Sequence, residues 1–364
     1  MSTLISMTGS ADLNTADFYD YDLPESSIAQ EPLADRAAAR LLVLDRATQS
    51  IRHMNIRDLP EILAPNDLLI VNDSQVVPAR LHGRRAKTDG RWEGLFLAEV
   101  VRDDGRRLLR LMSKTRGTLR VGERLVIMDK DGGDQAVLEL VSRDSGGTWL
   151  VDPCSDEPTL DFLSRVGRVP LPGYIREGIA RSEDVERYQT VFAERPGSAA
   201  APTAGLHFTP SLLRELERRG VKRAEVTLHV GIDTFRPIGT KQIDEHAMHS
   251  EWCAVSEETV AAIRHTKGIN GRVVAVGTTA VRSLETAAKA GATEAFVGAT
   301  DLYIRPGYSF CTVDAMLTNF HMPRTTLMVL VSAFAGYDFM RHAYQEAIRA
   351  GYRFLSYGDA MLIL

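Results

Sequence analysis

Cysteine is scarce in this chain, and the cysteines that occur lie far apart. Cys154, Cys253 and Cys311 form no CxxC pair, so we expect neither a zinc ribbon nor a disulfide framework. Long apolar runs are also lacking. The longest, residues 327–335, is much shorter than the ~20 residues of a membrane-spanning helix. We therefore expect a cytoplasmic protein without a membrane segment, whose small, polar residues 1–15 form a frayed tail.

An excess of positive charge is missing as well. The 364 residues carry a net charge of -5, so the whole chain shows no basic footprint for nucleic acid, although such a footprint can be local. The nucleotide-binding loops GxxxxGK[ST] and GxGxxG do not occur, and no GxSxG elbow surrounds Ser198. A hydrophobic content of 44% and this length indicate a globular protein with two or three domains.

Hydrophobic patterning divides the chain. Short apolar runs at 41–44 and 68–71 predict buried strands. Between about residues 80 and 150, alternating runs recur between Gly, Asp and Arg turns, which predicts a small barrel. We therefore expect a mixed α/β domain, 1–76 and 156–364, interrupted by an inserted all-β, barrel-like domain at 77–155.

The stretch 187–210 has the most unusual composition. Residues 197–205 are almost only Gly, Ala, Ser, Pro and Thr, so they have little apolar volume to bury and let backbone approach a ligand closely. His207 follows, and then Thr209 and Pro210 predict a helix start. A loop of this kind suits a ligand cradle. The alternative is a plain surface loop.

A second ligand-binding signal is a strand that runs into a glycine turn. Residues 272–276, apolar after Arg272, are predicted to form a buried strand, the turn 277–279 follows, and a helix is predicted over 280–290. Such a unit presents backbone N–H groups at the carboxyl end of a strand, where α/β proteins commonly bind ligands. At the two ends of the chain, residues 17–24 are predicted to be extended and 353–364 to form a last buried strand.

One histidine lies on an apolar strand. Taken alone, His229 resembles a satisfied core histidine, but Asp233, Thr234 and Arg236 follow it closely. These neighbours make it a candidate for binding or proton transfer.

Two other pairs of polar residues are candidates for substrate contacts. Asn319 and His321 come just before an apolar helix. His246 and His249 would lie on one face of a helix, but the HExxH spacing and a third ligand are missing. We therefore favour polar or substrate contacts over a metal for these histidines, and we expect no metal site.

The predicted barrel is rich in arginine and lysine. Two interpretations stay open: cations that protect edge strands, or a local phosphate-binding face. The residues concerned are Arg80, Arg84, Arg85, Lys87, Arg106, Arg107, Arg110, Lys114, Arg116 and Arg120.

Nine motifs occur together and in order along the chain. They are DFYDYDLPESSIAQEPL (17–33), NDSQVVPARLHG (72–83), GRVPLPGYI (167–175), ERYQTVFAERPGSAAAPTAGLHFTPSLL (186–213), VTLHVGIDTFRPI (226–238), HAMHSE (246–251), GTTAVRSLE (277–285), RPGYSFCTVDAMLTNFHMPRTTLMVLVSAFAG (305–336) and YRFLSYGDAMLIL (352–364). With these motifs the chain resembles the S-adenosylmethionine:tRNA ribosyltransferase-isomerase family of queuosine biosynthesis, the QueA family. The resemblance covers nearly the whole chain.

The resemblance implies a reaction. Members of the family move the ribosyl carbons of S-adenosylmethionine onto 7-aminomethyl-7-deazaguanine at the tRNA wobble position. The product is epoxyqueuosine, and adenine and methionine are released. Beyond S-adenosylmethionine, which is consumed, no cofactor is expected. The implied partner is the tRNA anticodon stem-loop, and we expect a monomer.

The resemblance also implies functional roles for the polar residues. His207, His229, Asp233 and His321 are the candidates for proton handling, without a choice of which is the base. The loops 197–205 and 277–279 would hold S-adenosylmethionine, and barrel arginines with Arg187 would hold RNA phosphates. The substrate-binding candidates are Arg80, Arg187, Tyr188, Ser198, Pro202, Thr203, Gly205, Thr234, Arg236, His246, His249, Gly277, Thr278, Thr279, Asn319 and Asp359.

Four features depart from the family pattern. Ile232 and Asp233 replace a small or Gly pair. Gln75 stands where an arginine is expected, Trp92 adds bulk to a turn expected to face RNA, and the segment 286–300 is short. These changes bear on the acceptor more than on the reaction class. Two alternatives follow: an enzyme of the same fold that acts on another nucleoside or a free base, and a catalytically silent tRNA-binding protein.

Overall fold

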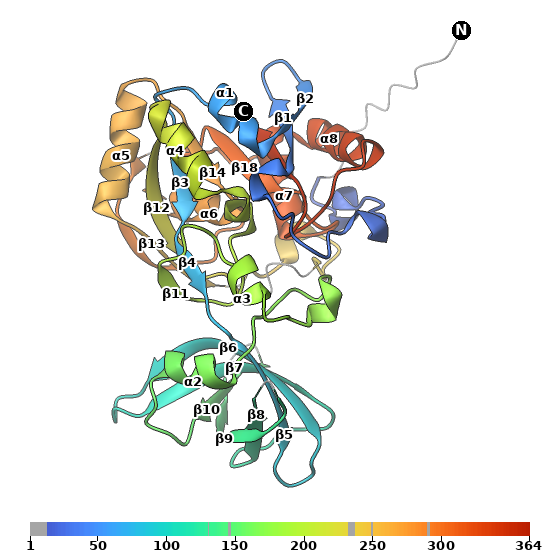
Figure 1. Ribbon diagram of the computed structural model, residues 1–364, viewed down its shortest axis with the longest axis vertical. Helices are drawn as coiled ribbons and strands as arrows, with labels where there is room; N and C mark the ends of the chain where they lie inside the picture. Colours follow the sequence, from blue (N-terminus) through green and yellow to red (C-terminus); the bar gives the residue numbers. More distant parts are fainter. Residues whose placement is uncertain (1–12, 130, 145–146, 232–236, 249, 290–291) are drawn as a thin grey trace.

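The chain folds into two domains, a larger one and a smaller one that lies beyond one end of the larger (Figure 1). The computed structural model describes residues 13–129, 131–144, 147–231, 237–248, 250–289 and 292–364. The larger domain contains a nine-stranded sheet, and the smaller one is a closed barrel. A mixed α/β domain with an inserted all-β barrel is the fold class that the patterning predicted.

The large sheet places four parallel strands side by side at its centre. Its strands, from edge to edge, are β17 (Phe296–Thr300), β13 (Glu251–Val255), β12 (Lys222–Leu228), β3 (Leu68–Asn72), β14 (Val273–Val276), β18 (Ala315–Asn319), β19 (Ala360–Ile363), β1 (Arg40–Asp45) and β2 (Ser50–Asn55). Strands β12, β3, β14 and β18 run parallel. Their carboxyl ends therefore meet at one edge of the sheet, the edge that faces the barrel (Figure 1).

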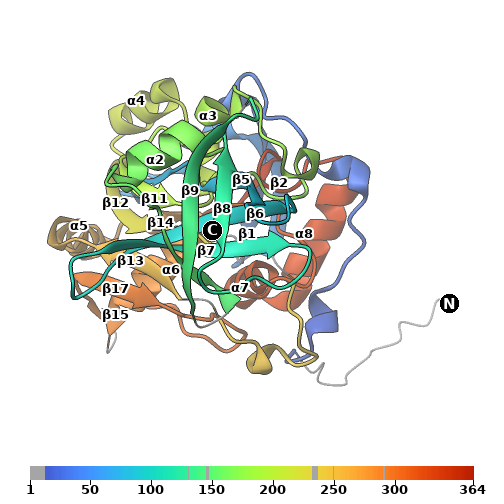
Figure 2. The ribbon, with the colours of Figure 1, turned by 90° about the horizontal axis from the view of Figure 1, so that it is seen from below.

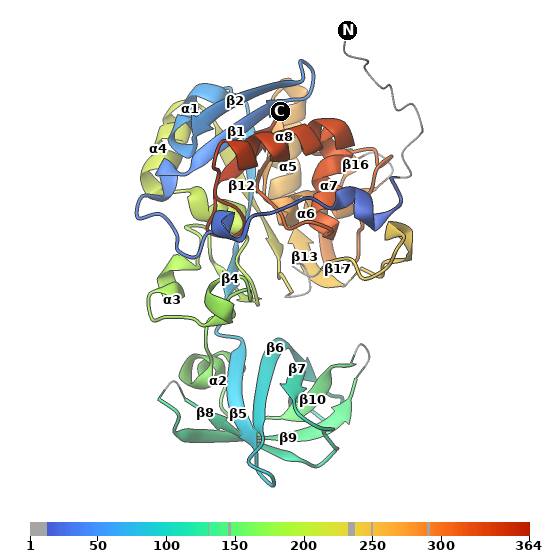
Figure 3. The same cartoon turned by 90° about the vertical axis from the view of Figure 1, so that its right-hand side faces the viewer.

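Helices cover both faces of this sheet (Figure 3). One face packs against α5 (Glu257–Gly268), α6 (Thr278–Ala287), α7 (Thr326–Ala335) and α8 (Tyr337–Arg349). The other face packs against α1 (Leu59–Ile62) and α4 (Pro210–Arg218). Helix α4 begins at Pro210, as predicted. Thr209 caps it, because the Thr209 side chain accepts a hydrogen bond from the Leu212 amide.

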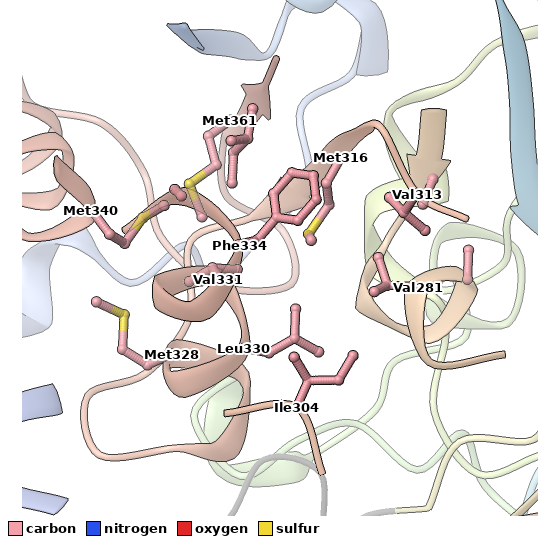
Figure 4. Packing of buried hydrophobic residues seen from close by; sticks show 14 of the residues in the cluster. Val281, Ile304, Val313, Met316, Met328, Leu330, Val331, Phe334, Met340 and Met361 are labelled. Carbon is pink, nitrogen blue, oxygen red and sulfur yellow. The ribbon is translucent and has the colours of Figure 1, made fainter. Parts of the chain in front are cut away.

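The apolar helix α7 is the centre of the larger core. Its ten residues carry no charge, and eight of them are buried. Figure 4 shows Met328, Leu330, Val331 and Phe334 of this helix amid methionines of neighbouring elements. Burial of this much apolar surface holds α7 and the preceding β18 in place, and β18 carries Asn319 into the site described below.

The barrel is closed by six strands, seen from its outer side in Figure 2. In barrel order they are β10 (Trp149–Asp152), β7 (Arg107–Thr115), β6 (Arg91–Val101), β5 (Arg80–Arg85), β8 (Arg124–Met128) and β9 (Asp134–Arg143). The boundaries at residues 77 and 155 stay a proposal. Helix α2 (Thr159–Val166) follows the second boundary and packs Phe162, Leu163 and Val166 into the barrel core.

The expected position of Trp92 is wrong. Its side chain is fully buried inside the barrel rather than on a turn that faces RNA. Alternate residues of a strand point to opposite faces, and β6 directs Trp92 and Gly94 inward. A β-carbon on Gly94 would lie 2.1 Å from the Trp92 ring, so the glycine leaves the space that the tryptophan occupies.

Two local predictions at the chain ends are also corrected. Residues 16–19 form a short 3-10 helix, η1 (Ala16–Tyr19), instead of an extended segment. The last strand is limited to β19, because the Asp359 carboxylate accepts hydrogen bonds from the amides of Arg40 and Arg353 and shapes a turn before it. Among the helices that the structure describes, none has both the length and the apolar character of a membrane span.

Candidate active site

The small-residue loop is tied to the ends of two strands. It starts in β11 (Arg195–Ser198), which pairs with β4 (Ser74–Val76). The Ser198 hydroxyl accepts a hydrogen bond from the Val230 amide at 2.9 Å and donates to the Ala200 carbonyl at 2.7 Å. Ser198, a substrate-binding candidate, thus uses its hydroxyl to hold the loop against the end of β12.

A hollow of about 580 Å³, open solvent included, lies where this loop meets the carboxyl ends of the parallel strands. We call it the central cavity. It brings together seven of the candidate residues from three separate parts of the chain. These are Pro202, Thr203, Gly277, Thr278, Thr279, Asn319 and His321.

The start of helix α6 forms one wall of the central cavity. Gly277 has a φ of +91°, a left-handed conformation that favours glycine, and no side chain caps the helix. The Thr279 hydroxyl is buried and has no hydrogen-bond partner among the described residues. Uncapped amides, the positive end of a helix dipole and a free hydroxyl together suit an anionic or hydrogen-bonding group of a ligand.

Asn319 connects the central cavity to His207. Its Oδ1 accepts a hydrogen bond from the Thr203 hydroxyl at 3.0 Å, and its Nδ2 lies 3.2 Å from Nε2 of His207. Burial lowers the pKa of His207 to about 4, and the positive charges of Arg36 and Arg353 act in the same direction. The imidazole is therefore neutral at pH 7 and can accept a proton.

His321 lies directly in the cavity wall. Its Nε2 is 3.0 Å from the Thr318 hydroxyl, and its backbone amide donates to the Tyr344 hydroxyl at 2.9 Å. Burial lowers the pKa of His321 to about 3. Like His207, it is neutral at pH 7 and held in a fixed orientation, and its lowered pKa makes it a weak base in the absence of substrate.

His229 stands just after β12, beside the loop. Its ring stacks on Trp252 with a centroid distance of 5.2 Å and an interplanar angle of 19°. Burial lowers its pKa, and Arg195 contributes. Gly197 has a φ of +144°, and a β-carbon there would lie 2.9 Å from Nε2 of His229. The glycine is thus what allows the loop to pass over the imidazole.

Several candidates lie outside the central cavity. Asp359 holds backbone amides, as described above, and Tyr188 is buried edge-on against Tyr357 at 5.9 Å. Gly205 packs toward Thr190, where a β-carbon would come within 3.0 Å. These contacts are structural ones that shape the walls around the site.

The remaining candidates are dispersed. Arg80 is half-buried at the junction of the domains and donates to the Leu171 carbonyl at 3.0 Å. His246 lines a separate pocket that Arg282 also lines. It follows a 3-10 turn, not the helix on which His246 and His249 were expected to share a face. Asp233, Thr234, Arg236 and His249 lie outside the described residues.

Several barrel arginines already have acidic partners. Arg84 pairs with Asp134 at 2.5 Å and Arg110 with Asp144 at 2.8 Å. Exposed pairs of this kind contribute little to stability and exchange readily. The pairs are compatible with either interpretation of the barrel, so the phosphate-binding face stays a prediction.

The structure adds cavity residues that were not singled out. Tyr174, Val230, Thr318, Thr325 and Ser356 also line the central cavity. Each of them lies within one of the motifs that carried the family resemblance. Only their place within these motifs could have pointed to the five residues from the sequence, because local periodicity does not show which side chains of a motif face a ligand.

Comparisons with known proteins found related sequences over almost the whole chain. A family model described as "Queuosine biosynthesis protein" matches residues 16–363. A protein of Thermotoga petrophila named "S-adenosylmethionine:tRNA ribosyltransferase-isomerase" is 47% identical over 346 residues, which cover 95% of this chain and 98% of the relative. A protein of Xylella fastidiosa with the same name is 47% identical over 351 residues, 96% of this chain and 97% of the relative.

A solved structure is similar over the same length. The crystal structure of an S-adenosylmethionine tRNA ribosyltransferase from Thermotoga maritima covers 95% of this chain and all of its own, with 39% identity and a TM-score of 0.54. The matches confirm the resemblance found in the sequence and the fold class.

Proposed function

Because the chain belongs to the family of queuosine biosynthesis proteins, we propose that it is an enzyme that transfers and isomerises the ribosyl moiety of S-adenosylmethionine onto tRNA. The acceptor is the aminomethyl group of 7-aminomethyl-7-deazaguanine at the wobble position. The products are epoxyqueuosine in tRNA, adenine and methionine. The observation that carries the proposal is the central cavity, in which residues of six family motifs meet at the carboxyl ends of parallel strands.

The lining of the cavity offers the chemistry that S-adenosylmethionine requires. The α6 amides and the Thr279 hydroxyl suit the carboxylate or a ribose hydroxyl of the ligand. Small residues of the loop, Ala201 and Pro202, leave room for the adenine ring beside Val230.

The two neutral histidines supply proton acceptors. The sulfonium of S-adenosylmethionine acidifies the adjacent C5′ protons, so that a positioned base can remove one of them and open the ribose as adenine leaves. The amine of the acceptor must also lose a proton before it attacks. His321 and His207 are our candidates for these tasks, because both are uncharged at pH 7 and each can accept a proton. Burial makes both weak bases, so the bound substrates must raise their pKa before either acts. His229 and Asp233 remain further candidates.

Other partners follow from the reaction. S-adenosylmethionine is a consumed co-substrate, and we propose no further cofactor. No cluster of three metal-ligating side chains occurs in the described ranges. Arg187 and the barrel arginines would contact phosphates of the anticodon stem-loop, and the modified base would leave the loop to react. We place the reaction in the cytoplasm and expect a monomer.

The proposal can be tested by adenine release. The protein is incubated with S-adenosylmethionine and tRNA that bears 7-aminomethyl-7-deazaguanine, and free adenine is measured. Release that requires the modified tRNA supports the proposal. The same release with tRNA that bears guanine would contradict the acceptor, and no release by a folded protein that binds S-adenosylmethionine would favour a different acceptor.

A further inference from the structure

A second hollow lies next to the central cavity. This side pocket spans about 290 Å³, open solvent included, and its lining includes Leu33, Arg36, Arg187, His207 and Tyr357. Ser356 lines both spaces. The hydrogen bond between Asn319, in the cavity wall, and His207, in the pocket wall, also joins them. The two spaces are therefore separated by one layer of side chains.

The side pocket offers one apolar surface and two cations. Leu33 and Leu206 supply apolar contacts, and Tyr357 supplies an aromatic ring. Arg36 is fixed by the carbonyls of Gln189 at 2.8 Å and Arg187 at 3.1 Å.

The positive charge in this pocket is largely uncompensated. No acidic side chain pairs with Arg36 among the described residues. Arg187 is half-exposed, and its distance to Glu183 is 4.0 Å. Positive charge beside an apolar, aromatic surface is the combination that unpaired nucleotides require, since phosphates and base faces must both be bound.

We propose that the side pocket receives the acceptor nucleobase of the RNA, while the central cavity holds S-adenosylmethionine. This assignment rests on the proposed function, which requires two substrates to meet. Asn319, His207 and Ser356 then form the layer at which the amine of the base and the ribosyl group approach each other.

The assignment predicts that the two substrates can be impaired separately. Leu33→Trp would fill the side pocket at a position that is 37% exposed, where a larger side chain can be accommodated. We expect it to raise the KM for the modified tRNA tenfold or more and to change the Kd for S-adenosylmethionine less than twofold. Thr279→Val in the central cavity should instead raise the Kd for S-adenosylmethionine roughly fivefold and change the KM for the modified tRNA less than twofold.

A second variant tests the cationic part of the pocket. Arg187→Ala should weaken tRNA binding and reduce the slope of log K against log salt by about one, as expected for one lost phosphate contact. The matched controls are Ile269→Trp, at an exposed site at the end of α5, and Arg218→Ala, on the exposed face of α4. Both should leave both substrates unaffected.

The outcomes separate this assignment from the proposed function. Wild-type turnover is measured first, and its absence would refute the proposed function itself. Wild-type turnover with an unchanged tRNA KM in folded Leu33→Trp would refute the pocket assignment alone. A raised Kd for S-adenosylmethionine in that variant would indicate that the side pocket binds S-adenosylmethionine instead of the nucleobase. If Leu33→Trp does not fold, Arg187→Ala takes its place. A raised KM for the modified tRNA with an unchanged Kd for S-adenosylmethionine would support the pocket assignment, and an unchanged KM would refute it.

Discussion

Asn319 determines which nitrogen of His207 carries the proton. The Asn319 Nδ2 lies 3.1 Å from the Leu355 carbonyl and 3.2 Å from Nε2 of His207. A carbonyl can only accept, so Nδ2 is the amide nitrogen and donates to both. The lone pair of Nε2 is thus engaged by Asn319 in the resting site. The neutral imidazole carries its proton on Nδ1.

The first prediction concerns this pair. Asn319→Asp keeps the shape of the side chain but replaces the donor by an acceptor, which would draw the His207 proton to Nε2. We expect kcat to fall by about 10²-fold or more, the size of a general acid–base contribution, and His207→Ala to abolish turnover. The measurements are kcat and the ¹⁵N chemical shifts of the imidazole. Normal turnover by a folded His207→Ala protein would remove this residue from the mechanism.

The second prediction concerns the unpartnered hydroxyl of Thr279. Thr279→Val preserves the volume but removes the group that we expect to bind S-adenosylmethionine. The Kd should rise roughly fivefold, because a hydrogen bond between neutral groups contributes ~1 kcal/mol. Titration calorimetry measures it, and Thr279→Ser, which retains the hydroxyl, is the control. Equal affinities of the two variants would show that the hydroxyl does not touch the ligand.

The third prediction concerns Gly197. An alanine there would need a φ near +144° and would bring its β-carbon to 2.9 Å from His229. We expect Gly197→Ala to lower the free energy of unfolding by about 1–3 kcal/mol. Gly173→Ala is the matched control, because Gly173 has no atom within 4 Å of the added carbon and no positive φ. Urea unfolding compares them, and equal stabilities would contradict the described packing of the loop.

The fourth prediction is a loss of stability in acid. Burial lowers the pKa of His207 to about 4 and of His321 to about 3, so the unfolded chain binds more protons than the folded one below pH ~6.5. This contribution is complete above pH 6.5 and is lost as the pH falls toward 3–4. His321→Asn should reduce the loss between pH 7.5 and 5 by about 2 kcal/mol. Parallel stability profiles for the variant and the wild type would show that His321 titrates normally.

The architecture could be predicted because its signals are local. Alternation between residues 80 and 150 identified the barrel, and the apolar run 68–71 corresponds to β3 at the centre of the sheet. The cap at Thr209 located the start of α4. Each of these features depends on neighbours within a few residues, which is the range that periodicity and capping report.

The orientation of individual side chains could not be predicted in the same way. Ser198 turns to Val230 and Gly205 to Thr190, because pairing between distant segments decides which side of the loop faces the cavity. Trp92 was assigned to a turn, but a shift of one residue along a strand exchanges inside for outside. The shared motifs identified the segments of the cavity, and the tertiary contacts decided which residues line it.

The most direct test follows the ribosyl carbons. The protein would be incubated with tRNA bearing 7-aminomethyl-7-deazaguanine and with S-adenosylmethionine labelled with ¹³C in the ribosyl group alone, and the digested nucleosides analysed by mass spectrometry. The account predicts a modified nucleoside that carries every labelled carbon, together with unlabelled adenine and methionine. An acceptor that gains only an unlabelled methyl group, or label that stays entirely with an adenosine product, would contradict ribosyl transfer by this protein.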